Sequence, residues 1–80
     1  MTRIDEHSPI NASQRELLVV CRDAGRPMTP AEIAQRLPGQ TGFSIRPTLM
    51  ALHRRGHLAK FGGATPRYQI TAHGIAILLR

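Results

Sequence analysis

The chain has 80 residues, a formal net charge of +6 and one cysteine, Cys21. A chain of this length forms a single domain with a modest core, and a lone cysteine excludes an internal disulfide. No stretch approaches the roughly 20 apolar residues of a membrane-spanning helix, and the N-terminus has acids where a secretory signal needs apolar residues. We therefore expect a cytoplasmic protein without membrane association, in which Cys21 is buried and reduced.

The charges are divided unevenly along the chain. Residues 1–32 hold four arginines and five acids, whereas residues 33–80 hold seven basic residues and no acid. A field of one sign over much of a small domain attracts a polyanion. Nucleic acid is the commonest polyanion in a cell, so it is the partner that the composition favours.

The first 12 residues show no hydrophobic periodicity, so we expect a flexible arm at residues 1–12 and one folded domain at residues 13–80. A helix is predicted over residues 14–24, because Ser13 and Glu16 have the spacing of a capping box, in which each side chain bonds the backbone N–H of the other residue. The apolar stripe of this helix consists of Leu17, Val20, Cys21 and Ala24. Gly25 ends the helix, because glycine readily adopts the left-handed conformation.

A second, short helix begins with the same device. Thr29 caps it, Pro30 occupies the first position, where its missing N–H costs nothing, and Glu32 closes the box. The pair at residues 38–39, Pro-Gly, ends this helix after barely two turns. Residues 26–28 before it have room only for a short extended stretch. The buried face of the helix consists of Ile33, Ala34 and Leu37.

The third helix lies between Pro47 and Gly56, because proline is tolerated in a first helical turn and is damaging later. Ser44 is the expected N-cap. The core stripe of this helix is Ile45, Leu49 and Leu52. Its opposite face carries no acid and consists of Arg46, Pro47, Met50, Ala51 and Arg54.

The hydrophobic periodicity then changes from helical to alternating. Residues 58–61 and 67–70 can each alternate apolar with polar side chains, and residues 62–66 between them are turn formers. This pattern predicts a β-hairpin whose loop is longer than a two-residue turn.

Thr71 caps a short last helix. Its residues 75–79 are five consecutive apolar residues, which is more than one face of a short helix can bury. The positions expected to face the core are Ile75, Leu78 and Leu79. Ile77 is then left over for a partner surface, together with Leu18, which predicts a homodimer through the terminal helices.

The order of these elements resembles a winged helix-turn-helix domain, in which a short helix is the usual first member of the helix-turn-helix. Residues 45–58 resemble the recognition helix of bacterial winged-helix transcriptional regulators, with its L..L...G.L ending, and residues 67–74 resemble the RY.LT..G that closes their wing. The resemblance covers residues 13–80. It implies a mainly α fold with a small β-hairpin (α+β), built as a three-helix core, a wing and a short C-terminal helix. It also implies a transcriptional regulator that binds double-stranded DNA without a cofactor.

Two departures from this pattern concern the turn and the wing. The turn at residues 38–44 is about one residue longer than the common version, which predicts an unusual entry angle for the third helix. Residues 63–68 also resemble the proline-rich wing of Z-DNA-binding winged helices. However, Arg46 and Met50 stand where that family has its Asn and Tyr contacts, which argues against recognition of Z-DNA.

In such domains the third helix enters the major groove and the wing contacts the flanking backbone. Because arginine is the usual bidentate reader of guanine, Arg46 and Arg54 are the first candidates for base contact. Lys60 and Arg67 lie on opposite strands of the hairpin and are expected to bracket the adjacent backbone. Further candidates for DNA contact are Gln40, Thr41, Ser44, Pro47, Thr48 and Met50.

A metal site and an enzyme find little support. His53 and His57 have i, i+4 spacing, but Gly56 ends the helix between them and no third ligand follows at a plausible distance. No acid follows Glu32, and no glycine-rich phosphate loop follows a strand. We therefore expect neither a metal nor catalysis.

The rival from another class is a winged-helix adaptor that binds a protein, since the fold alone does not define the partner. Phe43, Met50 or residues 75–79 would form its docking surface. Salt dependence separates the two hypotheses, because phosphate contacts weaken with salt and an apolar surface shows little such change.

Overall fold

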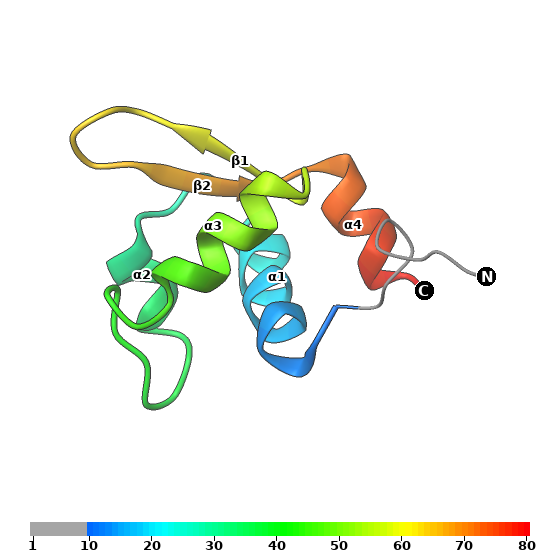
Figure 1. Ribbon diagram of the computed structural model, residues 1–80, viewed down its shortest axis with the longest axis horizontal. Coiled ribbons are helices and arrows are strands. Elements are labelled where there is room, and N and C mark those ends of the chain that lie inside the picture. The colour runs from blue at the N-terminus through cyan, green and yellow to red at the C-terminus, as the bar shows by residue number, and fades with distance from the viewer. Residues whose placement is uncertain (1–9) are drawn as a thin grey trace.

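The computed structural model describes residues 10–80 of the chain (Figure 1). In chain order its elements are α1 (Ala12–Ala24), α2 (Pro30–Ala34), α3 (Arg46–Arg54), β1 (Leu58–Phe61), β2 (Arg67–Ile70) and α4 (Ala72–Leu78). The prediction of a mainly α domain with a small β-hairpin and a short C-terminal helix is confirmed. Over the described residues, none of the helices combines the length and apolar character that a membrane span requires.

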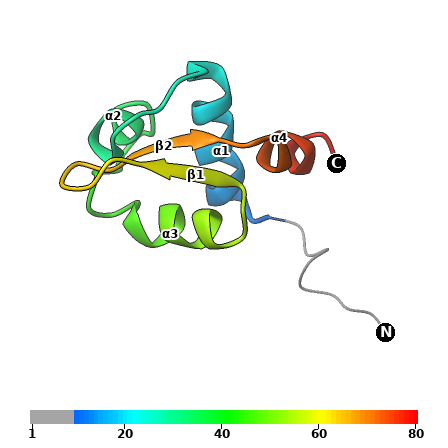
Figure 2. The same cartoon turned by 90° about the horizontal axis from the view of Figure 1, so that it is seen from above.

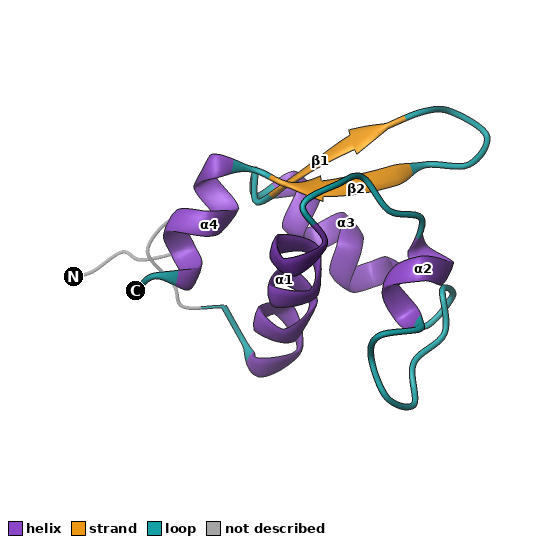
Figure 3. Cartoon of the chain, turned by 180° about the vertical axis from the view of Figure 1, so that it is seen from behind, coloured by secondary structure: helices purple, strands orange, loops and turns teal. Residues whose placement is uncertain are grey.

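The core surrounds α1, which lies between α2 and α3 on one side and α4 on the other, beneath the hairpin (Figures 1 and 3). Cys21 on α1 is fully buried, as expected, and burial raises the pKa of its thiol to about 12. The large core side chains are Ile10, Leu17, Leu18, Met28, Ile33, Ile45, Leu49, Leu52, Leu58, Tyr68, Ile77 and Leu78. Each element therefore contributes to one continuous core.

The start of α1 differs from the prediction. Asn11, not Ser13, caps the helix: its side chain accepts from the Gln14 N–H at 2.8 Å, and the Gln14 side chain accepts from the Asn11 N–H at 3.0 Å. Ile10 is buried in the core, which pulls the chain inward two residues earlier than the cap at Ser13 would. The rest of the predicted flexible arm lies outside the described residues.

The short helix α2 has the predicted start. Thr29 Oγ1 accepts from the Glu32 N–H at 3.2 Å, and a Glu32 carboxylate oxygen accepts from the Thr29 N–H at 2.9 Å. Just before it, the predicted extended stretch pairs with the hairpin, because Met28 and Tyr68 exchange backbone hydrogen bonds of 2.9 and 2.7 Å. The N-terminus of α2 is thus held next to the wing.

The start of α3 also differs from the prediction. Ser44 does not cap it; the chain turns through residues 42–45 first, and Thr41 and Ser44 bond each other's backbone N–H at 2.9 and 3.0 Å. The Ile45 N–H already bonds the Thr41 carbonyl in helical fashion, at 3.2 Å. Thr41 therefore opens the helical path one turn before the expected cap, and Ser44 is its reciprocal partner.

The hairpin follows α3 and has the predicted strands. In its antiparallel register Lys60 lies opposite Tyr68 and Phe61 lies opposite Arg67. The loop of residues 62–66 projects beyond the body of the domain at the end where α2 lies (Figures 1 and 2). The wing thus extends alongside α2 and α3.

The buried face of α4 was predicted only in part, although Thr71 caps the helix as expected, accepting from the Gly74 N–H at 3.0 Å. Leu78 is buried as predicted and Ile77 beside it is only 6% exposed, whereas Ile75 and Leu79, which were expected to face the core, are 41% and 80% exposed. Gly74 decides this rotation, because it packs against the chain at residue 57 and thereby turns the positions three and four residues later inward. Leu18 is also fully buried, so neither Leu18 nor Ile77 can form a partner surface.

Candidate nucleic-acid interface

The solvent-facing side of α3 is the one that the helical periodicity predicts. Leu49 and Leu52 are buried, and the side chains of Arg46, Pro47, Met50 and Arg54 on the opposite face are exposed. This surface continues onto Phe43 in the preceding turn. Because residues 33–80 contain no acid, the surface holds positive and apolar groups without a compensating carboxylate of its own.

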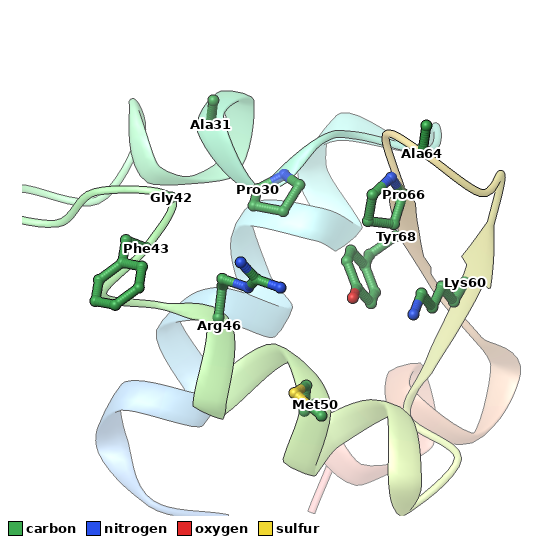
Figure 4. A pocket seen from close by; sticks show the side chains of 10 residues that line it. All are labelled: Pro30, Ala31, Gly42, Phe43, Arg46, Met50, Lys60, Ala64, Pro66 and Tyr68. Carbon is green, nitrogen blue, oxygen red and sulfur yellow. The ribbon is translucent and has the colours of Figure 1, made fainter.

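A groove of about 480 Å³ separates α3 from the wing and from the start of α2 (Figure 4). Arg46 extends from α3 toward the space between Pro30 and Tyr68, and Lys60 extends from β1 toward the same space. The groove is lined by Pro30, Ala31, Gly42, Phe43, Arg46, Met50, Lys60, Ala64, Pro66 and Tyr68. The structure therefore brings together two cations, Arg46 and Lys60, that are 14 residues apart in sequence.

The two cations of the wing face opposite sides. Lys60 shares a face with its cross-strand partner Tyr68, and Arg67 shares the other face with Phe61. Arg67 Nη1 lies 3.8 Å from a Glu32 carboxylate oxygen, and Arg26 Nη1 lies 3.9 Å from the other. The pKa of Glu32 is lowered mainly by the hydrogen bond from the Thr29 backbone to its carboxylate, with smaller contributions from the two arginines. The charge of Arg67 is thus partly balanced, whereas Lys60 faces the groove.

The polar candidates before α3 are engaged with one another. Ser44 Oγ donates to the Gln40 side-chain oxygen at 2.8 Å, and Ser44 and Thr41 close their reciprocal pair. Thr48 lies on the side of α3 that faces α1, where it lines a separate hollow with Glu16. The first role of Gln40, Thr41 and Ser44 is therefore to shape the turn, and their DNA contacts stay a prediction.

The histidines within residues 10–80 lie at the other end of α3. His57 is buried and its ring stacks on His73 of α4 at 4.9 Å between ring centres, whereas His53 Nδ1 lies 3.0 Å from the Leu58 carbonyl oxygen. Within residues 10–80, no three side chains of His, Cys, Asp or Glu lie close enough together to hold a metal ion. The imidazoles belong to the junction between α3, β1 and α4 rather than to the exposed face.

No protein-family model and no curated protein sequence matches the chain. Among solved structures, a mutant of S. aureus MepR bound to an oligodeoxyribonucleotide superposes with a TM-score of 0.78, at 21% identity, over 88% of this chain and 54% of that one. The fold is a winged helix-turn-helix.

Two further structures agree. The hsRosR-S1 complex matches with a TM-score of 0.75 at 19% identity, over 88% of this chain and 67% of that one. The hsRosR-S4 complex matches with a TM-score of 0.77 at 20% identity, over 92% and 69%. The chain spans about half the length of the MepR chain. The resemblance implied by the sequence motifs is thus confirmed as a likeness of fold to these winged-helix proteins.

Proposed function

We propose that this protein is a transcriptional regulator that binds double-stranded DNA sequence-specifically, with α3 in the major groove and the wing on the flanking backbone. The observation that carries the proposal is the exposed, acid-free face of α3, with Arg46 directed into the same groove as Lys60. A major groove admits one α-helix, and arginine bonds both acceptors of guanine. The similar fold of a MepR mutant bound to an oligodeoxyribonucleotide supports DNA as the partner.

In this proposal the side chains divide into two groups. Arg46 and Arg54 contact base edges, because they lie on the outward face of the helix that occupies the groove. Lys60 and Arg67 contact phosphates, which position the domain and carry no sequence information. Hydroxyl and amide donors near the start of α3 come from Gln40, Thr41, Ser44 and Thr48. Pro47 lies against the wall of the DNA major groove.

An adaptor that binds a protein is the second candidate, because Phe43 and Met50 are exposed apolar side chains. They share one shallow surface with Arg46 and Arg54. Arginines interleaved with apolar groups, without a carboxylate in the second half of the chain, fit a polyanion better than a protein surface of mixed charge. We therefore favour DNA.

Binding of a random duplex, measured by gel shift over a range of salt concentrations, tests the proposal. Binding through about five basic contacts gives a log–log salt slope of roughly −4 to −5. The double substitution Lys60→Ala/Arg67→Ala should weaken this binding, because both side chains contact phosphates in the proposal. The matched control is Arg22→Ala, which removes an exposed arginine of α1 that pairs with Asp23 at 3.2 Å. Absence of duplex binding at low salt, or binding that salt does not weaken, would contradict the proposal.

The regulator is proposed to act in the cytoplasm as a homodimer. One such module contacts only a few base pairs, and two-fold pairing on two half-sites raises specificity. The apolar side chains that α4 leaves exposed are Ile75 and Leu79, and these exposures support a proposed dimer surface there in place of Ile77.

A further inference from the structure

Two large apolar side chains lie among the arginines of the α3 face, and the core does not use them. Phe43 is 81% exposed and Met50 is 51% exposed. Both line the same shallow surface as Arg46, Pro47 and Arg54. Phe43 comes from the turn before α3 and Met50 from the helix itself (Figure 4). Side chains that stay this exposed contribute little to the stability of the fold, because apolar surface left in water gains nothing from folding.

The spacing along α3 orders these groups. Arg46, Met50 and Arg54 follow one another at intervals of four residues, so they form one row on the helix surface, with steps of about 6 Å along the axis. Consecutive base pairs are about 3.4 Å apart. If α3 lies along the major groove, Met50 is therefore placed between the bases that the two arginines reach, about two base pairs from each.

The major groove offers one apolar group among the edges of the four bases, and that group is the C5-methyl of thymine. We propose that Met50 and Phe43 are specificity-determining residues that recognise thymine methyl groups, in the same site as guanines contacted by Arg46 and Arg54. The inference rests on the proposed function, because it assigns the bases that the same α3 face recognises. A preferred site then contains a thymine about two base pairs from guanine, and loss of a methyl group alone weakens it.

Deoxyuridine provides the test, because it lacks the C5-methyl group and keeps the pairing of thymine. A preferred duplex is first selected from a randomised pool, and each thymine is then replaced singly by deoxyuridine. We expect affinity to fall about three- to fivefold at one or two positions, which is what burial of one methyl group supplies. Replacement at the remaining thymines should leave affinity unchanged.

Protein variants then connect each methyl group with a side chain. In Met50→Ala the loss at one thymine should disappear while the loss at another is kept, and Phe43→Ala should show the reverse. Phe61→Ala is the matched control, because Phe61 is an exposed phenylalanine of the wing, away from α3, and should keep both losses. Thermal unfolding of each variant establishes that it is folded.

The outcomes separate this inference from the proposed function. A protein that selects and binds a duplex, yet binds every deoxyuridine version equally well, overturns the recognition of methyl groups and leaves DNA binding intact. Recognition of methyl groups by these two side chains is also overturned, with DNA binding intact, if Met50→Ala and Phe43→Ala both keep the deoxyuridine losses unchanged. A protein that binds no duplex at low salt overturns the proposed function and this inference together.

Discussion

Gly74 of α4 lies directly against the backbone carbonyl of His57, at the junction where α3 passes into β1. A β-carbon at residue 74 would overlap the His57 oxygen and would come within 2.8 Å of the Ile70 side chain. The Thr71 N–H donates to the same His57 carbonyl at 3.1 Å, and Thr71 Oγ1 donates to the Gly56 carbonyl at 2.7 Å. These backbone contacts hold α4 against the rest of the domain.

The substitution Gly74→Ala should therefore destabilise the domain, although alanine is the better helix former by about 1 kcal/mol. Because the added methyl group meets backbone that cannot rotate away, we expect a net loss of about 1–3 kcal/mol in the free energy of unfolding, measured in urea. Gly63→Ala is the control, since nothing lies within 4 Å of its β-carbon position. A Gly74→Ala variant as stable as Gly63→Ala would contradict the close packing.

The cap of α1 gives the second prediction. Asn11→Ala should lower the free energy of unfolding by about 1 kcal/mol, because it removes the acceptor for the Gln14 N–H. Ser13→Ala is the matched control within the first turn and should stay within about 0.5 kcal/mol of the wild type. Denaturant unfolding of both variants measures the difference. If Ser13→Ala is the more damaging change, the helix starts at Ser13 after all.

The third prediction concerns pH. His57 is 2% exposed, and the pKa of its imidazole is lowered from the usual 6.5, first by burial and then by the neighbouring charges of His73, Arg55 and Arg80. The folded state therefore binds this proton less readily than the unfolded chain does. The neutral His57 imidazole therefore makes its full contribution to the free energy of unfolding above pH 6.5. This contribution is lost as the pH falls below that value toward the folded-state pKa.

Urea unfolding at neutral pH and near pH 5 checks this sign. The wild type should be less stable at the lower pH, and His57→Phe should show a smaller difference between the two pH values, because it keeps a buried ring that cannot be protonated. His53→Gln, which replaces an exposed ring, is the control. A wild type that gains stability on acidification would refute the assignment to His57.

The fourth prediction compares the two wing cations. Lys60→Ala should weaken specific and random duplex alike and make the log–log salt slope shallower by about 1. Arg67→Ala should change the slope less, because Glu32 lies 3.8 Å away and already balances part of its charge. In a Glu32→Gln background, Arg67→Ala should change the salt slope as much as Lys60→Ala does, because residue 32 then carries no charge. Equal slopes for Lys60→Ala and Arg67→Ala would mean that Glu32 does not restrain Arg67.

The fifth prediction addresses the dimer. If α4 forms the interface, the double substitution Ile75→Lys/Leu79→Lys should produce monomers in sedimentation, because it places two charges on the apolar surface that α4 exposes. Phe61→Lys, on the exposed wing, should leave the assembly unchanged. A monomeric wild type rejects the dimer, and a dimer that survives the double substitution lies elsewhere.

The short-range features of this protein could be predicted from the sequence. The capping box of Thr29 and Glu32, the left-handed Gly25 at φ 64° and the strands of the hairpin each depend on residues a few positions apart. The outward face of α3 was also predictable, because Leu49 and Leu52 are strongly apolar and define the buried side by periodicity alone.

Three features were decided only by the tertiary structure. Asn11 and Ser13 are equally good caps, and the choice between them depends on whether Ile10 reaches the core. The rotation of α4 depends on the space at Gly74, which an apolar run of five residues does not reveal. The ion pair of Arg67 with Glu32 joins residues 35 positions apart. Sequence by itself determined the capping box of α2, the strands of the hairpin and the acid-free second half of the chain. Packing between distant segments decided which side chains stay free to bind, because such contacts leave no periodic trace along the chain.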